Sequence, residues 1–522
     1  MAIAPHQHDD MSRRSFLFLV AALWLGNIVP ALDATLVGTA LPTVIGSLDG
    51  IALYSWVFAA YLLALTISIP IFGKLIDALG RKPIYFFGMG LFTVGAIASS
   101  LVQNVEQLIA CRVLIGVATA SIVPSAMTIM GDAIPIERRA KIQWVFASAW
   151  FLSSVTGPAI AAAITAWLSW RFVFLTTVPL CLVASYLMAT EYHEYVERQP
   201  HRIDFAGIAL LGGGVLALLF ALSPTNRSAG IDFASSGGLL ALAAVLLAAF
   251  LWNETSAAEP VLPPRLFLAP VLGIAALGSA MSGIAQSGAQ SFIPMFVQGG
   301  QGGTVADVGF VLPWLTIGWP IGAGLGGRLL LRFGFRNTVI AGMMLIVVAQ
   351  AGFLLLDRDS SRWLAAASMA LMGLGFGFSS VSFTISVQSS VGWSDRGVAT
   401  ASLQFFRSIG GSIGVAIMGT IVSLRMQPLS DAAAQSGAGV SANALLDPAA
   451  RGAMAPAVLT ALQSGMTEAI HASFWVMLIA TLAGLVAVLW FPYTIGSPED
   501  AAPASDPEPQ PVLAESRPGD PA

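Results

Sequence analysis

The chain has 522 residues and a formal net charge of −4; 56% of its residues are hydrophobic and only 10% are charged. Soluble domains carry about 25% charged residues, so a soluble protein of this composition could not cover its own surface with polar groups. The small net charge also gives no reason to expect a nucleic-acid partner. The composition therefore predicts an integral membrane protein.

The apolar residues come in blocks of about twenty, the length of a helix that crosses a hydrocarbon core about 30 Å thick. The first block, after Arg13 and Arg14, is too long for the core of a cleavable signal peptide and is expected to stay as a span. Cys111 and Cys181 both lie in apolar blocks, which argues against a disulfide framework. We expect fourteen spans, at residues 16–41, 51–73, 83–101, 106–130, 141–166, 170–190, 204–223, 234–252, 268–297, 306–327, 336–356, 363–388, 396–423 and 470–491.

Basic residues predict the orientation of these spans. With both termini cytoplasmic, sixteen Lys and Arg residues fall on the cytoplasmic face and six on the other, which is a strong positive-inside bias. The residues 493–522 are rich in Pro, Ala, Asp and Glu and are expected to be a disordered cytoplasmic tail. The cytoplasmic group is Arg13, Arg14, Lys74, Arg81, Lys82, Arg138, Arg139, Lys141, Arg198, Arg202, Arg265, Arg328, Arg332, Arg336, Arg396 and Arg517; the other group is Arg171, Arg227, Arg358, Arg362, Arg425 and Arg451.

The sequence contains an internal repeat. Gly73–Lys82 follows the second span and Gly327–Arg336 follows the tenth, and in both the glycines are seven residues apart with basic residues after the first glycine and at the end. Arg138 precedes the fifth span as Arg396 precedes the thirteenth, so both offsets pair spans 1–6 with spans 9–14. Two related halves are typical of a transporter with a central site. We expect an all-α polytopic membrane protein with a tail at 1–15, six-helix bundles at 16–203 and 268–492, two extra helices in 204–267, and a long extracytoplasmic loop at 424–469.

Asp33 is the one acid that lies well inside a predicted span. A carboxylate in hydrocarbon costs several kcal/mol, so this side chain should face a polar cavity or a partner. Because desolvation favours the neutral form, the group could take up a proton on one side of the membrane and release it on the other. The alternative is a structural acid that only forms hydrogen bonds near a helix end.

Two arginines lie deep in predicted spans, Arg112 in the fourth and Arg407 in the thirteenth. A guanidinium stays charged at any relevant pH and therefore cannot carry the proton, but it can bias a nearby carboxylate or bind an anion. The alternative for either residue is a clamp on neighbouring backbone carbonyls.

The Gly73–Lys82 stretch joins two spans at a predicted cytoplasmic end. Gly73 and Gly80 permit a close approach and a tight turn. Asp77 can pair with Arg81 or sit against the positive end of a neighbouring helix, which would give a polar latch that breaks and re-forms. A plain orienting loop would need Arg81 and Lys82 but not Asp77 or the glycines.

Gly157 and Pro158 lie inside the fifth span and are followed by small residues. The proline predicts a kink and the small residues permit close helix packing, so together they favour a helix that flexes where the two halves meet.

Aromatic and amide side chains from several spans are candidates for an apolar substrate cavity. Gln286 and Gln290 are four residues apart and would share a helix face, whereas tryptophans in membrane proteins also serve as interfacial anchors. Since the sequence has no metal-ligand cluster, phosphate-binding loop or Ser/His/Asp arrangement, we expect no enzyme and no cofactor beyond a proton gradient. The cavity candidates are Trp56, Tyr61, Trp144, Trp150, Gln286, Gln290, Trp314, Trp319 and Arg407.

These motifs together resemble the major facilitator superfamily, and within it the drug:proton antiporters of the fourteen-helix (EmrB/QacA) type. Five stretches carry the resemblance over about residues 13–492. Leu32–Pro42 resembles the first-helix signature, Gly73–Lys82 the loop 2–3 signature, and Leu108–Gly116 the fourth-helix arginine motif. Gly157-Pro158 resembles the fifth-helix antiporter motif, and Trp170–Pro179 the start of the sixth helix in that branch.

The resemblance implies export of hydrophobic or amphipathic compounds in exchange for protons across a bacterial cell (inner) membrane. It assigns proton coupling to Asp33 and Arg112 and the conformational switch to Gly73, Asp77, Gly80, Arg81 and Lys82. Gly157 and Pro158 would act as the hinge of the antiporter motif. A periplasmic adaptor and an outer-membrane channel are partners that it implies in a cell with two membranes.

The chain departs from the pattern at Ala161 and Ala162, which replace the usual glycine pair, at Thr177, where asparagine is common, and at Leu331, where the second copy of the loop signature lacks an acid. Rival interpretations are a dedicated exporter of one metabolite or siderophore, a proton-coupled importer, and a membrane receptor or scaffold that no longer transports. Gly157-Pro158 argues against the importer, and Asp33 with the loop signature argues against the receptor.

Overall fold

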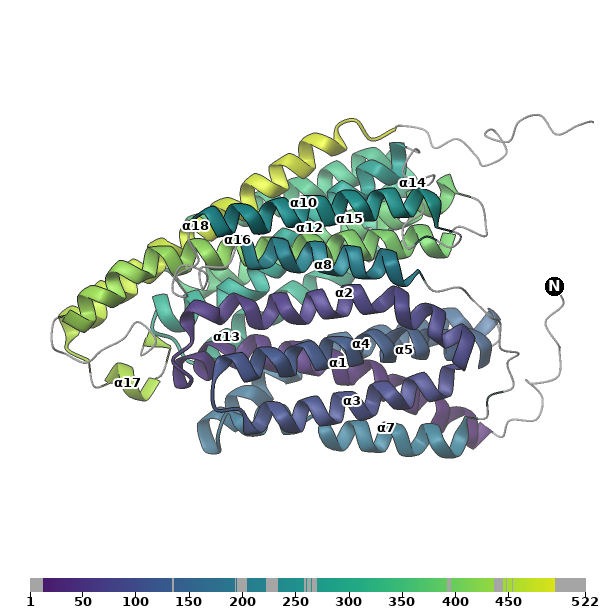
Figure 1. The fold of residues 1–522 in the computed structure, drawn as a ribbon, viewed down its shortest axis with the longest axis horizontal. Helices are drawn as coiled ribbons and strands as arrows, with labels where there is room; N and C mark the ends of the chain where they lie inside the picture. The colour runs from purple at the N-terminus through teal and green to yellow at the C-terminus, as the bar shows by residue number, and fades with distance from the viewer. Residues whose placement is uncertain are drawn as a thin grey trace, which may run out of the picture.

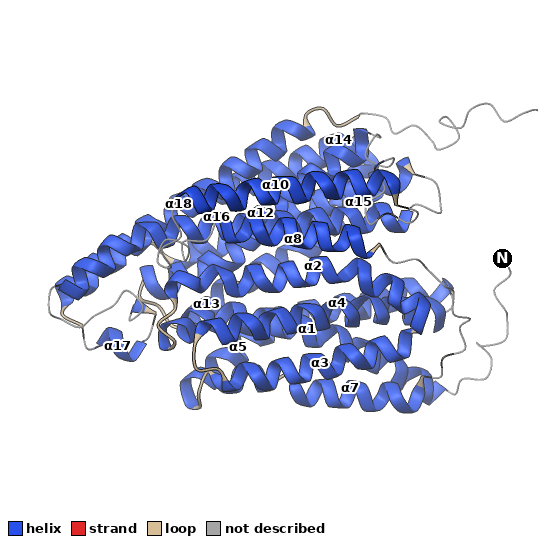
Figure 2. Ribbon diagram, in the orientation of Figure 1, coloured by secondary structure: helices blue, strands red, loops and turns tan. Residues whose placement is uncertain are grey.

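The computed structural model describes residues 13–133, 136–192, 194, 204–221, 233–257, 260, 264, 270–391, 396–435, 445–446, 448–452 and 454–492. Within these ranges the chain forms helices joined by turns and short loops, and no strand occurs among them (Figure 2). The expected all-helical fold is confirmed for this part of the chain.

Most helices run along the long axis of the molecule (Figure 1). The N-terminal half contains α1 (Arg13–Ser47), α2 (Tyr54–Leu79), α3 (Arg81–Leu101), α4 (Val105–Ala133), α5 (Ile136–Trp167), α6 (Arg171–Leu175) and α7 (Val178–Glu191), followed by α8 (Phe205–Ala221) and α10 (Phe233–Ser256). The C-terminal half contains α12 (Pro270–Met295), a π-helical turn (Phe296–Gly300), α13 (Val305–Val311), α14 (Pro313–Leu354), α15 (Arg362–Ser390), α16 (Arg396–Gln435), α17 (Pro448–Gly452) and α18 (Pro456–Val488).

Twelve helices in the described part of the chain are long and apolar enough to cross a membrane, against the fourteen spans expected from the sequence. The observed and the expected counts of spans differ because of two segments of the chain. The residues Val305–Leu354 form one continuous helical stretch where the tenth and eleventh spans were expected, and Phe205–Leu218, at the expected seventh span, is a shorter apolar helix. The chain is therefore a multi-pass membrane protein with at least most of the expected spans.

The two copies of the internal repeat share a backbone break at their second glycine. Gly80 separates α2 from α3 with φ 102° and ψ 159°, and Gly334 interrupts α14 with φ 80° and ψ 172°. Positive φ is accessible to glycine and rarely to other residues. The repeated glycines therefore mark the same device in both halves, a sharp turn between two consecutive helices.

The connection expected as a loop at 424–469 is largely helical where it is described. α16 continues to Gln435, and α18 already begins at Pro456. Proline is favourable in the first turn of a helix, which fits Pro456 at the start of α18, whereas α16 continues through Pro428 to Gln435. Both helices extend beyond the rest of the bundle at the left of Figure 1.

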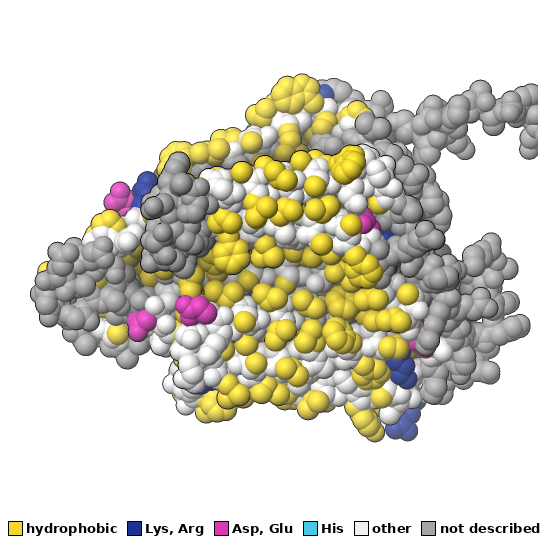
Figure 3. All heavy atoms as spheres, viewed as in Figure 1, with side chains coloured by type: hydrophobic (Ala, Val, Ile, Leu, Met, Phe, Trp, Pro, Cys, Tyr) yellow, Lys and Arg dark blue, Asp and Glu magenta, His cyan; other side chains and the backbone are white. Residues whose placement is uncertain are grey.

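α8 and α10 lie on the near side of the bundle, beside α2 and the C-terminal helices (Figure 1). A hydrophobic cluster joins them to α2 and α16 through Trp56, Leu211, Phe250 and Phe405. Apolar side chains cover the middle of this face, and charged side chains gather toward its two ends (Figure 3). This distribution fits a surface whose middle faces lipid.

Candidate functional site

A buried ion pair joins α1 to α4 within the N-terminal half. The Nη1 of Arg112 lies 2.9 Å from Oδ2 of Asp33, and Nη2 lies 3.3 Å from Oδ1, so the guanidinium donates to both carboxylate oxygens. Asp33 is 4% exposed and Arg112 is 2% exposed. The guanidinium also lies over the ring of Phe174, 5.4 Å from its centroid. Loss of one partner from such a pair costs about 3–5 kcal/mol, because the other charge stays buried without compensation.

The helix that carries Asp33 packs without a gap against α5. A Cβ added at Gly157 would lie 2.2 Å from Oγ1 of Thr35. The same hydroxyl donates to the carbonyl of Ser153 at 3.0 Å, which ties the two helices together two residues from Asp33. Glycine at position 157 therefore sets the distance between α1 and α5.

Pro158 continues this contact into the C-terminal half. A Cβ added at Gly309, on α13, would lie 2.9 Å from Cβ of Pro158. The Gly157-Pro158 pair thus touches α1 on one side and the C-terminal half on the other. A shift of α1 relative to α5 would therefore change the contact between Pro158 and Gly309 at the interface between the halves.

The two halves are joined by a side-chain clamp at the end of the bundle that carries the α1–α2 connection, called here the clamp end. Gln298, in the π-helical turn after α12, donates through Nε2 to the carbonyl of Thr39 at 3.0 Å. Its Oε1 accepts from Oγ1 of Thr43 at 2.8 Å. Tyr54 donates to the carbonyl of Ser291 at 2.7 Å at the same interface. Gln298 is 1% exposed, so it is shielded from water, and the oxygen and the nitrogen of its amide both form hydrogen bonds with α1 instead.

Arg451, on α17, binds the back of the same turn. Its Nη1 donates to the carbonyl of Gln298 at 2.6 Å and its Nη2 to the carbonyl of Gly303 at 3.0 Å. Gly299 leaves no room for a side chain, because an added Cβ would meet Met466 of α18 at 2.1 Å. The segment between α16 and α18 therefore helps to hold the clamp in place.

At the opposite end of the bundle, the glycine turn of the first half is capped by an acid that the sequence motifs did not include. Glu194 accepts from the backbone N–H of Arg81 at 2.5 Å and of Lys82 at 3.3 Å, and it fills the space beside Gly80. A carboxylate at a helix N-terminus is favourable because the free N–H groups carry partial positive charge. The ammonium of Lys82 donates to the carbonyls of Ala189 and Tyr192. The side chain of Asp77 lies outside the described residues.

Arg407 lies in the C-terminal half at a small cavity of about 20 Å³, which has room for about one water molecule. Its guanidinium is 5.2 Å from the centroid of the Trp319 ring and donates to Oε1 of Gln404. Among the residues that the structure describes, no acid lines this cavity, whose walls are Ser279, Ser282, Trp319, Phe376, Ser379, Ser380, Phe383 and Arg407. A cation among hydroxyl groups and aromatic rings can accept an anionic or neutral polar group.

The other cavity candidates are scattered. Trp56 packs against Phe220 of α8, with ring centroids 5.0 Å apart, and Trp314 packs near Trp363 at 6.3 Å. Tyr61 interacts electrostatically with Asp33 and Arg112 and so belongs to the region of the ion pair. The remaining candidates with described side chains are Gln286, half-buried, and Gln290 and Trp150, exposed; the side chain of Trp144 lies outside the described residues.

Sequence patterns gave little signal for the residues that were missed. Gln298 is an uncharged residue between Val297 and Gly299 at the end of an apolar block, and Glu194 lies in a polar connection between spans. Their hydrogen-bond partners are far away in sequence, and only the packed structure brings them near. The glycines at 299 and 300 were the one local hint of an irregular helix end.

The family model of the Major Facilitator Superfamily matches residues 23–252 and 204–415 of this chain. The chain is 35% identical over 422 residues to the multidrug transporter protein MdtP of Bacillus subtilis, covering 80% of this chain and 77% of that protein. It is 29% identical over 486 residues to multidrug resistance protein 3 of the same organism, covering 91% and 94%. It is 28% identical over 505 residues to the tetracenomycin C resistance and export protein of Streptomyces glaucescens, covering 94% and 93%.

Solved structures share the fold at low sequence identity. A bacterial homologue of the human lysosomal transporter Spinster, in an inward-facing and unoccupied conformation, superposes with a TM-score of 0.69 at 18% identity and covers 93% of this chain and 100% of that one. An auto-inhibited peptide transporter of the POT family gives a TM-score of 0.63 at 15% identity, with coverage of 92% and 98%. Family model, relatives and fold agree: this chain belongs to the major facilitator superfamily.

Proposed function

We propose that this protein is a proton-coupled antiporter that exports hydrophobic or amphipathic compounds by alternating access. The observation that carries the proposal is the buried, doubly hydrogen-bonded pair between Asp33 and Arg112. It places a group that can gain and lose a proton on the helix that also forms the clamp between the halves. The printed names of the relatives, which describe multidrug transport and the export of one antibiotic, support the direction of transport.

The chemistry of the pair supplies the coupling. A carboxylate of Asp33 accepts two hydrogen bonds from Arg112, and a proton added to either oxygen removes one acceptor and the charge that holds the guanidinium. The released α1 can then move against α5 at the close contact between Thr35 and Gly157. Because Pro158 touches Gly309, this movement reaches the C-terminal half and the clamp at Gln298, so the state of the ion pair is coupled to the state of the clamp. Protonation from outside, while the clamp end is open, would release α1 and let the halves close there, and loss of the proton to the inside would re-form the ion pair between Asp33 and Arg112.

We propose fourteen spans for the whole chain. Gly334 divides the stretch Val305–Leu354 into two crossings, and α8 is the seventh. The two six-helix halves then lie at 16–203 and 268–492, with α8 and α10 between them in sequence.

An even number of spans puts both termini on one side, and the excess of Lys and Arg assigns that side to the cytoplasm. The clamp end is then extracytoplasmic, and a structure held together there corresponds to an inward-facing state.

The charged side chains along the proposed transport passage restrict the net charge of the substrate. Arg112 is balanced by Asp33, whereas the serine-lined cavity at Arg407 holds a cation and no acid. A second positive charge on a substrate would have to enter beside that cation without a counter-charge, at a cost of Coulomb repulsion in a low dielectric. We therefore propose neutral, monocationic or anionic amphiphiles as substrates and expect dicationic drugs to be poor ones.

The experiment that tests the proposal is transport in proteoliposomes that carry a fluorescent amphiphile and a pH-sensitive dye. Wild-type protein should release protons when substrate is added and should accumulate substrate under an imposed pH gradient. Asp33→Asn keeps the shape of the side chain but cannot exchange a proton, so we expect its gradient-driven transport to fall to the background of protein-free liposomes. Unchanged gradient-driven transport by Asp33→Asn would refute the coupling scheme.

A dedicated exporter of a single compound is the second candidate, and the relative named for tetracenomycin C export favours it. A resistance panel separates the two. If cells that express the wild type resist several unrelated amphiphiles, and cells that express Asp33→Asn lose that resistance, the multidrug proposal is supported. Resistance to one chemical class alone supports the dedicated exporter.

A further inference from the structure

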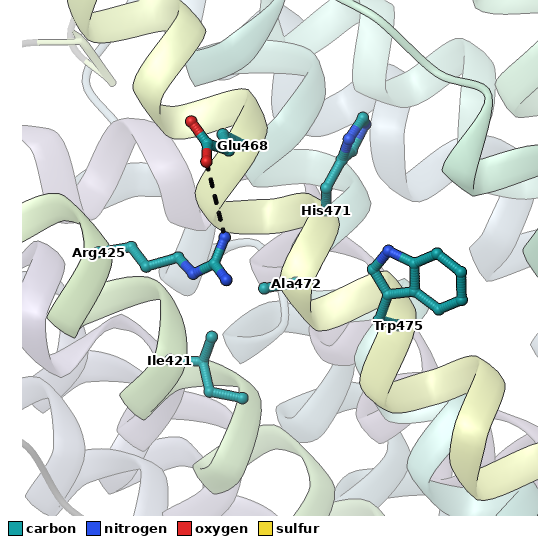
Figure 4. Close-up of a pocket in the computed structure, with 6 residues that line it drawn as sticks. All are labelled: Ile421, Arg425, Glu468, His471, Ala472 and Trp475. Atoms are coloured by element: carbon teal, nitrogen blue, oxygen red, sulfur yellow. Dashed lines mark ion pairs between the residues drawn. The ribbon is translucent and has the colours of Figure 1, made fainter.

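A pocket of about 540 Å³ lies between α16 and α18, at the clamp end of the bundle and away from the Asp33 and Arg407 sites. It is lined by Ile421 and Arg425 from α16 and by Glu468, His471, Ala472 and Trp475 from α18. Figure 4 shows Arg425 reaching from α16 toward Glu468 on α18, with Ile421 one turn along the same helix. None of these residues takes part in the proposed transport chemistry.

The exposed side chains of α18 and of the turn after it show how deep in the membrane this pocket lies. Trp475, Ile479 and Val486 of α18 and Trp490, two residues past its end, are 54%, 62%, 49% and 71% exposed and follow one another at helical spacing. Trp475 and Trp490 are fifteen residues apart, which is about 22 Å of helix. Exposed tryptophans at the two ends of an apolar stripe are typical of the two membrane–water interfaces. The apolar stripe of α18 therefore spans most of the hydrocarbon core.

Glu468 lies two helical turns, about 10 Å, beyond Trp475. Since the core is about 30 Å thick and the headgroup layers add roughly 5–8 Å on each side, Glu468 lies at headgroup level. Arg425 is at the same level, because its Nη1 is 4.0 Å from Oε1 of Glu468. Below them, Ile421, Ala472 and Trp475 line the pocket toward the hydrocarbon.

The two charges are available to a ligand. Their separation of 4.0 Å is at the limit of an ion pair, and their side chains are 51% and 81% exposed. Exposed pairs of this kind contribute little to stability, so a ligand that satisfies both charges can replace the contact between them. Such a ligand needs an anionic group for Arg425, a hydrogen-bonding cation for Glu468 and an apolar part that extends past Trp475.

We propose that the pocket binds a zwitterionic phospholipid with a primary ammonium headgroup, of the phosphatidylethanolamine class. The phosphate accepts hydrogen bonds from the Arg425 guanidinium, the ammonium donates N–H bonds to Glu468, and an acyl chain lies along Trp475 and Ile479. A choline headgroup carries the same charges but has no N–H to donate, and a glycerol headgroup has no cation. The site therefore selects the headgroup by its N–H donors.

Native mass spectrometry of the purified full-length protein in detergent tests this proposal. Phosphatidylethanolamine and its mono-, di- and trimethylated forms, with identical acyl chains, are titrated in turn, together with phosphatidylglycerol. We expect affinity to fall stepwise as methyl groups replace N–H donors, by about tenfold over the whole series, as for the loss of one charge-assisted hydrogen bond. This series changes the lipid alone and does not depend on whether any variant folds.

Substitutions at Arg425 and Glu468 test whether the lipid binds in this pocket. Glu468→Gln should bind phosphatidylethanolamine no better than its trimethylated form, and Arg425→Gln should weaken binding of both. Arg362→Gln is the matched control, because Arg362 is a half-exposed cation whose partner is Asp307, 2.6 Å away, and which does not line the pocket. Equal affinity across the methylation series, tighter binding of phosphatidylglycerol, or an undiminished preference in Glu468→Gln would overturn the proposal.

Discussion

At the scale of single residues, the smallest side chains near Asp33 control the geometry of the site. The ion pair fixes α1 to α4, while Gly157 lets α5 come so close that the Thr35 hydroxyl reaches the Ser153 carbonyl. Ala161 replaces a glycine of the family pattern and is fully buried, so close packing in this part of α5 tolerates one methyl group there. No such tolerance exists at position 157.

We predict that Gly157→Val abolishes transport. Its Cβ would lie 2.2 Å from Oγ1 of Thr35, so α1 and α5 must separate, and overpacking of this kind costs about 1–3 kcal/mol. Transport in proteoliposomes and the melting temperature in detergent measure the two effects. Gly90→Ala is the control, because nothing lies within 4 Å of a Cβ added to that glycine on α3, and both quantities should stay at wild-type values. Full activity of Gly157→Val would mean that the contact between α1 and α5 is not needed.

At the scale of helices and turns, the irregular segment after α12 carries the contact between the halves. A π-helical turn widens the helix and re-aims its side chains, which here directs Gln298 toward α1. Arg451 and the close packing of Gly299 against Met466 hold this turn from behind. The turn is therefore packed into the C-terminal half on one side and binds α1 of the N-terminal half through the Gln298 side chain on the other.

We predict that Gln298→Ala shifts the conformational equilibrium away from the state held at the clamp end. Two hydrogen bonds between the halves are lost, at about 1 kcal/mol each, which corresponds to a population change of about thirtyfold. Electron paramagnetic resonance between spin labels on Ser47→Cys and Ala306→Cys, both exposed, should report longer distances across the clamp end. Cys111 and Cys181 are buried and leave the labelling specific.

Gln301→Ala is the matched control for this clamp. Gln301 is one residue beyond the same turn, but its amide donates to the carbonyls of Asp357 and Ser360, both within the C-terminal half. Its loss should leave the distance distribution across the clamp end unchanged. If both variants, or neither, changed the distribution, Gln298 would not be the residue that joins the halves.

The sequence predicted the positions of the helices more accurately than the contacts between their side chains, for physical reasons. Apolar blocks of membrane length and the repeated glycine pairs depend on local composition, and Gly80 and Gly334 indeed break the chain at matching places. In a helix that is apolar all round, the pattern cannot tell which face meets lipid, a neighbour or a cavity. Trp56 was therefore a cavity candidate in the sequence but packs against Phe220 of α8. Gln298 and Glu194 were missed because their partners are backbone groups brought close by packing alone.

At the scale of the whole molecule, the two halves can exchange access only if the clamp end opens. In Figure 1, α18 slants away from the nearly horizontal helices of the N-terminal half toward the end that carries Arg13. The halves meet at the clamp end through Gln298 and through Gly419, where an added Cβ would lie 1.9 Å from Oγ of Ser55. A covalent bond across that end should hold the protein in one state.

We predict that oxidising Thr43→Cys and Gln298→Cys to a disulfide during turnover, when opening of the clamp end exposes both positions to the oxidant, stops transport and that a reducing agent restores it. The side chains at these positions are in contact, 2.8 Å apart, and belong to different halves. Asp307→Cys with Arg362→Cys is the control, because that pair is 2.6 Å apart at the same end but lies within the C-terminal half, which moves as one body in alternating access. Its cross-linked form should transport at the rate of its reduced form. Transport that continues at full rate with the first pair cross-linked would show that the halves need not separate at Gln298, and the alternating-access scheme would then have to place its extracytoplasmic gate elsewhere.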